Sequence, residues 1–223
     1  MEAILECKGF LFDLDGTLVD SLPVVEQAWC RWADRHGLGH DDVLAFIHGK
    51  QAITSLRHFL VGYSEAQIQE EYRWLETVEA RDVDGIAALP GALALLRYLD
   101  AQQIPWAIVT SGSVPVAHAR HAAAGLPQPK VFVTAEQVTH GKPEPDAYLL
   151  GARLLGLAPS DCAVVEDAAA GVLSGLAAGC RVIAVNVPAD APRLDEVDFV
   201  LTSLEQIALR KEDDGSVQVQ RRA

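Results

Sequence analysis

From residue 88 onward, short apolar runs alternate with segments of helical periodicity, and this alternation limits the fold more than any other feature. Glycine and proline mark the breaks, as at Pro90-Gly91. Such alternation predicts parallel strands joined by helices that cover both faces of a sheet. With a first strand at 8–13, we expect a doubly wound, Rossmann-like α/β core, and Asp214-Gly215 predicts a terminal hairpin. The further expected strands are 105–110, 131–133, 162–165, 181–185 and 198–201, and the expected helices are 91–102, 115–124, 145–156, 168–178 and 203–208.

Residues 20–86 interrupt this alternation with helical patterns alone. Pro23 stands in the opening turn of the first pattern, where its missing N–H costs nothing. Ligands of open α/β sheets bind at the carboxyl ends of the strands, so an insertion after the first strand would stand over the site. We therefore expect a helical cap at 20–86 on an α/β core formed by 1–19 and 87–223. The expected cap helices are 22–36, 41–47, 52–61 and 65–82.

The composition of the chain argues against several kinds of partner. Acidic residues outnumber basic ones 31 to 18, and the net charge of −13 disfavours nucleic acid, whose phosphate backbone requires a basic face. No uncharged apolar run reaches the roughly 18 residues of a membrane span, and the N-terminus lacks the basic start of a signal peptide. The four cysteines show neither CxxC spacing nor a secreted framework. We expect a cytoplasmic monomer or weak homo-oligomer that binds neither nucleic acid nor membrane.

Two aspartates, Asp13 and Asp15, end the apolar run of FLFDLDGTLVDS. Positions i and i+2 of a strand share a face, so both carboxylates point the same way from the end of a buried strand. Like charges this close are unfavourable unless a cation neutralises them or one carboxyl keeps its proton. A divalent metal would satisfy the pair, and a protonated carboxyl would serve acid–base catalysis.

Three further polar elements follow apolar runs. Ser111-Gly112 follows WAIVT and suits phosphate oxygens, although such a pair alone is more often a plain turn. Lys142 in GKPEPD is either held by Pro143 and Pro145 for a ligand or exposed before a helix. Glu166 and Asp167 follow CAVV, and helix capping explains two adjacent acids less well than it explains Asp167 alone. Together at one sheet edge, these groups predict a divalent cation with oxygen ligands beside a phosphoryl group.

The motifs DLDGT, VTSGS, GKPEPD and VVEDAAAG stand in the order typical of one family. The chain resembles the haloacid dehalogenase-like (HAD) hydrolases over nearly its whole length, in the branch with a helical cap after the first motif. That branch includes bacterial sugar phosphatases, hexitol phosphatases among them, and β-phosphoglucomutase. LAFIHGKQAITSLRHF and IPWAIVTSGS are especially similar to the hexitol phosphatases. The resemblance implies hydrolysis of small phosphorylated sugars or polyols with Mg²⁺ as cofactor.

The same resemblance implies roles for the acidic residues. Asp13 would be the nucleophile and would form an aspartyl-phosphate. Asp15 would act first as general acid and then as general base. Mg²⁺ would be held by Asp13, by the backbone carbonyl of Asp15 and by Asp167, with Glu166 acting through a bound water.

Substrate contacts are implied for a second set of residues. Ser111, the N–H of Gly112 and Lys142 would hold phosphoryl oxygens. Within the cap, HGKQ resembles the family's substrate loop, so Lys50 and Gln51 could reach sugar hydroxyls or a carboxylate. A solvated turn between two helices is the alternative for that loop.

A few positions distinguish a phosphatase from its rival functions. Haloacid dehalogenases lack the second aspartate, so Asp15 argues against that activity. Phosphoglucomutase-like members usually carry a cap histidine and a cap arginine where this chain has Val25 and Ala52, and Thr17 also fits the phosphatases. A catalytically silent binding protein is the rival of another class, but it has no need for so unfavourable a carboxylate cluster.

Overall fold

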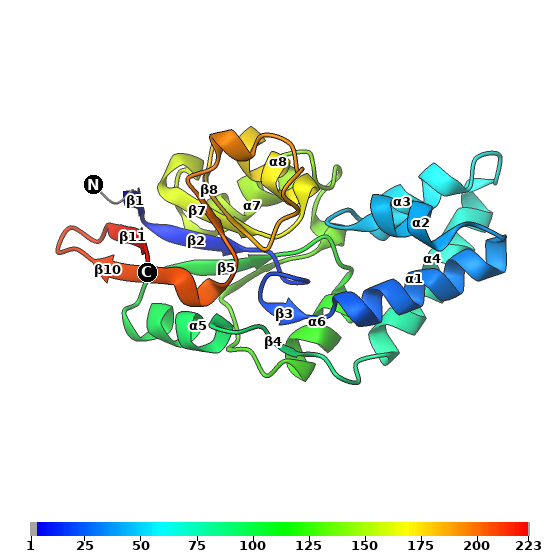
Figure 1. The fold of residues 1–223 in the computed structure, drawn as a ribbon, viewed down its shortest axis with the longest axis horizontal. Coiled ribbons are helices and arrows are strands. Elements are labelled where there is room, and N and C mark those ends of the chain that lie inside the picture. Colours follow the sequence, from blue (N-terminus) through cyan, green and yellow to red (C-terminus); the bar gives the residue numbers. More distant parts are fainter. Residues whose placement is uncertain (1–3, 223) are drawn as a thin grey trace.

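The protein is built around a six-stranded sheet with strand order β6-β5-β2-β7-β8-β9, in a computed structural model that describes residues 4–222 (Figure 1). Neighbouring strands pair in parallel throughout, and Phe10 of β2 lies beside Trp106 of β5 and Ala163 of β7. The predicted doubly wound α/β core is confirmed. The strands are β2 (Gly9–Phe12), β5 (Trp106–Val109), β6 (Val131–Val133), β7 (Cys162–Glu166), β8 (Arg181–Val185) and β9 (Phe199–Leu201).

Helices cover both faces of this sheet. Successive side chains along its buried strands point to opposite faces, so each face presents apolar side chains that a layer of helices buries. Phe10 and Phe12 pack in the apolar cluster that includes Leu96 of α5, whereas Leu11 packs in the cluster that includes Tyr148 of α7. Both faces are therefore closed, and the carboxyl ends of the strands are left for the polar residues. The helices are α5 (Ala92–Ala101), α6 (Val114–Ala123), α7 (Asp146–Leu155) and α8 (Ala169–Ala177).

Four helices between β2 and β5 pack around an apolar cluster of their own, which includes Trp32, Leu56 and Leu75. They are α1 (Leu22–His36), α2 (His40–Ile47), α3 (Ala52–Phe59) and α4 (Glu65–Arg81). Two short antiparallel strands, β3 (Val19–Asp20) and β4 (Ala87–Ala88), lie where the chain enters and leaves this unit. In Figure 1 the four helices project beyond one end of the sheet, and α4 lies against α6 of the core.

The chain ends form a three-stranded antiparallel sheet in the order β1-β11-β10. Its strands are β1 (Ile4–Cys7), β10 (Ile207–Lys211) and β11 (Val217–Arg221), and the hairpin predicted at Asp214-Gly215 is confirmed. The helix predicted at 203–208 is wrong. Ser203 accepts a hydrogen bond from the N–H of Glu205 and caps a single 3₁₀ turn, after which the apolar residues follow strand periodicity.

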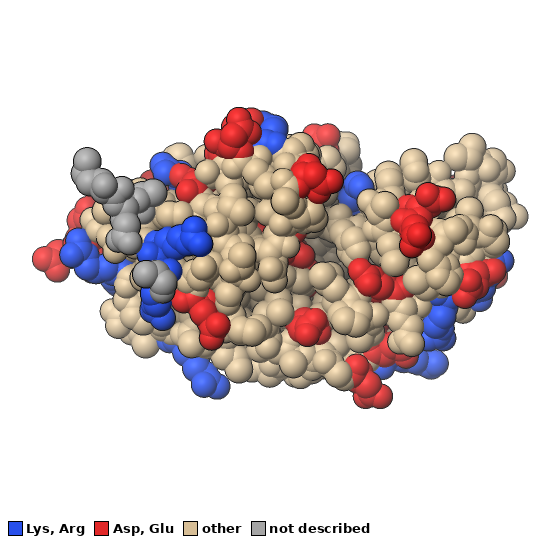
Figure 2. Space-filling view, viewed as in Figure 1, with Lys and Arg blue, Asp and Glu red and all other residues tan. Residues whose placement is uncertain are grey.

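Acidic side chains are spread over the surface, and the face in Figure 2 is hollowed between the core and the helical unit. Figure 2 also shows lysine and arginine near the terminal sheet, away from that hollow. Within residues 4–222, no helix has both the length and the apolar character needed to cross a membrane.

Candidate active site

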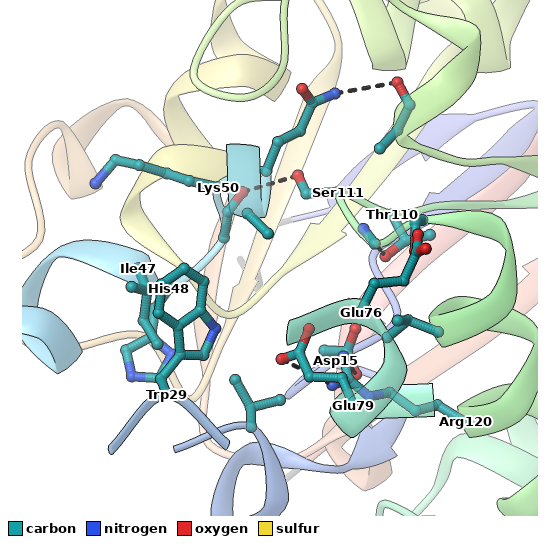
Figure 3. Close-up of a pocket in the computed structure, with 18 of the residues that line it drawn as sticks. Asp15, Trp29, Ile47, His48, Lys50, Glu76, Glu79, Thr110, Ser111 and Arg120 are labelled. Atoms are coloured by element: carbon teal, nitrogen blue, oxygen red, sulfur yellow. Dashed lines mark hydrogen bonds and ion pairs between the residues drawn. The ribbon is translucent and has the colours of Figure 1, made fainter. Parts of the chain in front are cut away.

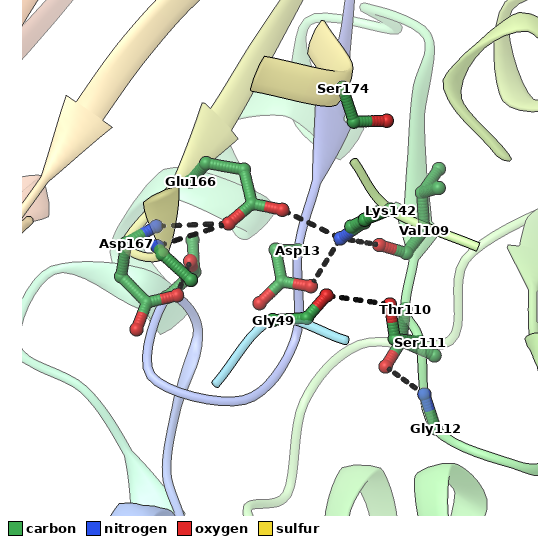
Figure 4. A network of polar contacts seen from close by, with 12 residues as sticks. Asp13, Gly49, Val109, Thr110, Ser111, Gly112, Lys142, Glu166, Asp167 and Ser174 are labelled. Atoms are coloured by element: carbon green, nitrogen blue, oxygen red, sulfur yellow. Dashed lines mark hydrogen bonds and ion pairs between the residues drawn. The ribbon is translucent and has the colours of Figure 1, made fainter. Parts of the chain in front are cut away.

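A buried lysine connects two carboxylates at the carboxyl edge of the sheet (Figure 4). Asp13 directly follows β2, and Glu166 is the last residue of β7. The Lys142 ammonium donates to Asp13 Oδ1 at 2.7 Å, to Glu166 Oε1 at 2.6 Å and to the carbonyl of Val109 at 3.0 Å. Burial alone would lower the pKa of Lys142, but the two carboxylates outweigh it and raise the pKa. Lys142 is therefore a fixed positive charge beside Asp13.

Glu166 is fully buried at the end of β7. Besides Lys142, its carboxylate accepts from the Tyr148 hydroxyl at 2.7 Å and from the N–H groups of Asp167 and Ala168 at 3.2 and 3.3 Å. Charged hydrogen bonds of this kind hold a buried carboxylate in one orientation. The position of Lys142 thus depends on Glu166.

The acidic groups have the composition of a site for a hard divalent cation. One oxygen each from Asp13, Glu166 and Asp167 lie within 4.8 Å of one another. Burial raises the pKa of Asp13 to about 7, and repulsion from Glu166 adds to this rise while Lys142 opposes it. Burial and repulsion from Asp13 also raise the pKa of Asp167. Three close carboxylates with one lysine leave negative charge uncompensated, and oxygen ligands suit Mg²⁺, so the residues fit that ion.

Gly16 allows Asp167 to approach the first motif. Its φ of +85° favours glycine, and a Cβ there would lie 2.1 Å from Asp167 Oδ2. Thr17 donates its hydroxyl to Asp167 Oδ1 at 3.0 Å. The segment Gly16-Thr17 therefore fixes Asp167 beside Asp13, which gives the two residues after Asp15 a geometric role.

Asp15 lies at the boundary between the core and the helical unit (Figure 3). Its Oδ1 accepts from the Ser21 hydroxyl at 2.6 Å and lies 3.1 Å from Nη1 of Arg120, which extends from α6. Nη2 of Arg120 lies 3.2 Å from Oε1 of Glu79 on α4. Sequence reasoning missed Arg120 and Glu79 because a charged residue within a helical pattern carries no signal of burial, and it assigned Ser21 no role at the site.

The two predicted phosphate donors at the end of β5 are engaged within the protein. The Ser111 hydroxyl donates to the carbonyl of Gly49 at 2.9 Å, and the N–H of Gly112 donates to Oγ1 of Thr110 at 3.0 Å. Both residues nevertheless line the pocket between the core and the helical unit. Of the residues predicted for the site, the pocket is lined by Asp13, Asp15, Lys50, Gln51, Ser111, Gly112 and Asp167, while Lys142 and Glu166 are buried.

A family model for haloacid dehalogenase-like hydrolases matches residues 7–179, which include all four motifs. The chain belongs to this family. It is 71% identical to hexitol phosphatase A of Escherichia coli over 97% of this chain and 100% of that protein. It is 32% identical to validoxylamine A 7'-phosphate phosphatase of Streptomyces hygroscopicus subsp. limoneus, over 90% of this chain and 95% of that protein.

Solved structures agree with the fold of this HAD hydrolase. A hydrolase from Pseudomonas syringae superimposes with a TM-score of 0.80 at 26% identity, over 89% of this chain and 94% of that chain. A β-phosphoglucomutase from Clostridium difficile superimposes with a TM-score of 0.75 at 22% identity, over 90% of this chain and 92% of that chain. At this identity the similarity shows the fold alone.

The loop 48–51 of this HAD hydrolase presents its two predicted substrate residues differently. The Lys50 ammonium donates to the carbonyl of Phe46 and lies 3.8 Å from the centroid of that ring, and in Figure 3 its chain extends away from Ser111. The buried Gln51 donates to the carbonyl of Ala135 at 3.3 Å. Lys50 is thus folded back on α2, whereas Gln51 connects the loop to the core.

Proposed function

We propose that this HAD hydrolase is a Mg²⁺-dependent phosphatase that hydrolyses small sugar and polyol (hexitol) phosphates through an aspartyl-phosphate on Asp13. The observation that carries the proposal is the Asp13 carboxylate, which lines the pocket and contacts the buried Lys142 at 2.7 Å. The names of the relatives that are 71% and 32% identical, hexitol phosphatase A and validoxylamine A 7'-phosphate phosphatase, support a phosphorylated sugar or polyol as substrate.

The proposed reaction has two displacements at phosphorus. In the first, an oxygen of Asp13 forms a bond to phosphorus as the bond to the ester oxygen breaks, and Asp15 gives that oxygen a proton. In the second, a water oxygen bonds to phosphorus, Asp15 takes its proton, and the bond to Asp13 breaks to release inorganic phosphate. Lys142 lowers the repulsion between the anionic nucleophile and the anionic ester, which is the main barrier that positioning and charge must overcome.

Mg²⁺ is assigned to the carboxylates of Asp13 and Asp167 with the backbone carbonyl of Asp15. When bound, it supplies positive charge beside the phosphoryl oxygens. Glu166 orients Lys142, and we also propose that Glu166 contacts the ion through a bound water. The three close carboxylates with a single lysine support this assignment.

Substrate contacts divide between the two units, with residues 20–86 proposed as a cap over the core formed by 1–19 and 87–223. Ser111, the N–H of Gly112 and Lys142 are assigned to phosphoryl oxygens. Lys50 and Gln51 are assigned to sugar hydroxyls, for which Lys50 would leave Phe46 and Gln51 would leave the carbonyl of Ala135. Because Ser111 and Gly112 now donate to protein acceptors, they would exchange those acceptors for phosphoryl oxygens when substrate enters.

Transfer of a phosphoryl group between sugar positions is the second candidate, because the fold is shared with a β-phosphoglucomutase. Val25 and Ala52, at the positions where mutases usually carry histidine and arginine, both line the pocket. Neither side chain can bind a second phosphate, which favours release to water. We further propose a cytoplasmic monomer or weak homo-oligomer, with free thiols at its four cysteines.

Phosphate release tests the proposal directly. The protein is incubated with a panel of hexitol, hexose and glycerol phosphates, with Mg²⁺ or with EDTA, and free phosphate is measured. We expect release that requires Mg²⁺ and stops in EDTA. Absence of release from every ester with Mg²⁺ present contradicts the proposal, and conversion of glucose 1-phosphate to glucose 6-phosphate with little free phosphate favours the mutase.

A further inference from the structure

Arg120 is a buried charge that connects the core to the helical unit. It extends from α6, its side chain is 4% exposed, and it lies between Asp15 and Glu79 of α4 (Figure 3). Burial alone would lower the pKa of Arg120, but Asp15 and Glu79 outweigh it and raise the pKa, so the guanidinium stays charged. A charge this deeply buried is unfavourable unless paired, and both of its partners line the same pocket.

The contacts of Asp15 gather on one of its two oxygens. The Ser21 hydroxyl and Nη1 of Arg120 both approach Oδ1, and no hydrogen bond among residues 4–222 reaches Oδ2. Ser21 occupies the N-cap position of α1, yet its hydroxyl caps no backbone N–H and is directed to Asp15 instead. A hydrogen bond from Ser21 and an ion pair with Arg120 both fall on Oδ1, so they restrict the rotation of the carboxylate and leave Oδ2 without a hydrogen bond within the described residues.

The contact between Arg120 and Glu79 is likewise an ion pair. Nη2 lies 3.2 Å from Glu79 Oε1 without hydrogen-bond geometry, and within the described residues Nε has no acceptor. Glu79 is itself 9% exposed, and burial raises its pKa while Arg120 opposes that rise. Arg120 therefore joins a core carboxylate and an α4 carboxylate through two ion pairs of similar length, and a shift of α4 would alter this shared pairing.

We propose that Arg120 is a positioning residue that orients Asp15, with Oδ2 directed to the reacting oxygen, and that Glu79 makes this orientation depend on the position of α4. The inference rests on the proposed function of Asp15 as acid and base. Arg120 itself touches neither the nucleophile nor the lysine. Its effect on the chemistry passes through Asp15, which is the proposed catalytic group that it contacts.

Methionine and lysine variants of Arg120 isolate this effect. Arg120→Met removes the charge at similar length, and Arg120→Lys keeps a charge that cannot span two carboxylates. The double variant Arg120→Met with Glu79→Gln avoids an unpaired buried carboxylate if the single variant folds poorly. Arg31→Met is the matched control, because Arg31 pairs with Asp82 at 2.8 Å where both side chains are exposed.

Two esters separate proton transfer from binding. The leaving group of hexitol phosphate needs a proton from Asp15. The second ester is p-nitrophenyl phosphate, from which p-nitrophenolate leaves without a proton. We expect Arg120→Met to slow single-turnover cleavage of hexitol phosphate by roughly 10- to 100-fold, with a KM within about 3-fold of the native value. The rate of the p-nitrophenolate burst should stay within about 3-fold of the native rate. Arg120→Lys restores part of the loss, and Arg31→Met has no effect. Equal loss on both esters overturns the proposal, since it means that Arg120 only supports the fold.

Crystal structures without substrate give a readout that needs no turnover. In the native protein we expect a single Asp15 orientation with Oδ1 on Arg120, and in the double variant a turned or divided carboxylate. An unchanged Asp15 in the variant overturns the proposal. A native enzyme that releases no phosphate instead refutes the proposed function, and the conformation of Asp15 still decides the role of Arg120.

Discussion

Gly171→Ala is predicted to damage the site although Gly171 carries no chemistry. Gly171 lies in α8, and a Cβ at this position would be 1.7 Å from Oε1 and 1.8 Å from Cδ of Glu166. Glu166 is fully buried, so its carboxylate has no solvent-filled space to enter. The alanine therefore displaces Glu166 from Lys142 and Tyr148, which it contacts at 2.6 and 2.7 Å.

The expected cost follows from two opposing contributions. Breaking a buried ion pair costs about 3–5 kcal/mol. Alanine in place of glycine within a helix contributes about 1 kcal/mol of stability. The net loss is about 2–4 kcal/mol in the free energy of unfolding, which for a chain of this size lowers Tm by roughly 5–15 °C. Phosphate release falls as well, since Lys142 loses one of the groups that orient it.

Calorimetry and phosphate release on matched variants test this prediction. Gly175→Ala on the same helix is the control, because its Cβ would meet Val164 and Val182 at 3.0 and 3.1 Å, where aliphatic side chains can yield. We expect Gly175→Ala to stay within about 1 kcal/mol of native. If Gly171→Ala melts at or above the native temperature with native activity, the assigned packing of Glu166 is refuted.

Two further predictions concern charge. Lys142→Met leaves Asp13 and Glu166 buried without their lysine, so we expect urea unfolding to show a loss of about 3–5 kcal/mol and phosphate release to fall at least about 100-fold; native activity in this variant would contradict the role of Lys142. Burial alone would raise the pKa of Glu71, but contacts led by His36 outweigh it and lower the pKa. Its stabilisation is present above the unfolded pKa near 4.5 and is lost as pH falls through the lower folded value, so Glu71→Gln should cost about 0.5–1 kcal/mol near pH 5.5 and less near pH 3; an equal cost at both would refute this.

The sheet and the convergence at its edge could be predicted from the sequence for a physical reason. Strand–helix alternation determines that the strands are parallel, and parallel strands bring their carboxyl ends together. Asp13, Ser111 and Asp167 each follow an apolar run closely, so their meeting at one edge needed no further information. The family resemblance added roles for them, which stay predictions.

The contacts that fix these residues could not be predicted. Nothing in the pattern of α6 marks Arg120 as buried, because its partners Asp15 and Glu79 come from distant parts of the chain. The sequence pattern indicates only that Tyr148 lies on the apolar side of a helix. Its hydroxyl contact with Glu166 forms only when the helix packs on the sheet. Tertiary packing also overrode the helical pattern at 203–208, where β10 pairs with β11.

Trapping of the covalent intermediate tests the central claim most directly. The enzyme is mixed with hexitol phosphate and Mg²⁺, quenched in acid within a turnover, and its peptides are analysed by mass spectrometry. The proposed mechanism predicts one phosphoryl group on the peptide that contains Asp13, and none in Asp13→Asn, which should melt like the native protein and release no phosphate. A phosphoryl group on another residue, or native phosphate release by Asp13→Asn, would contradict it.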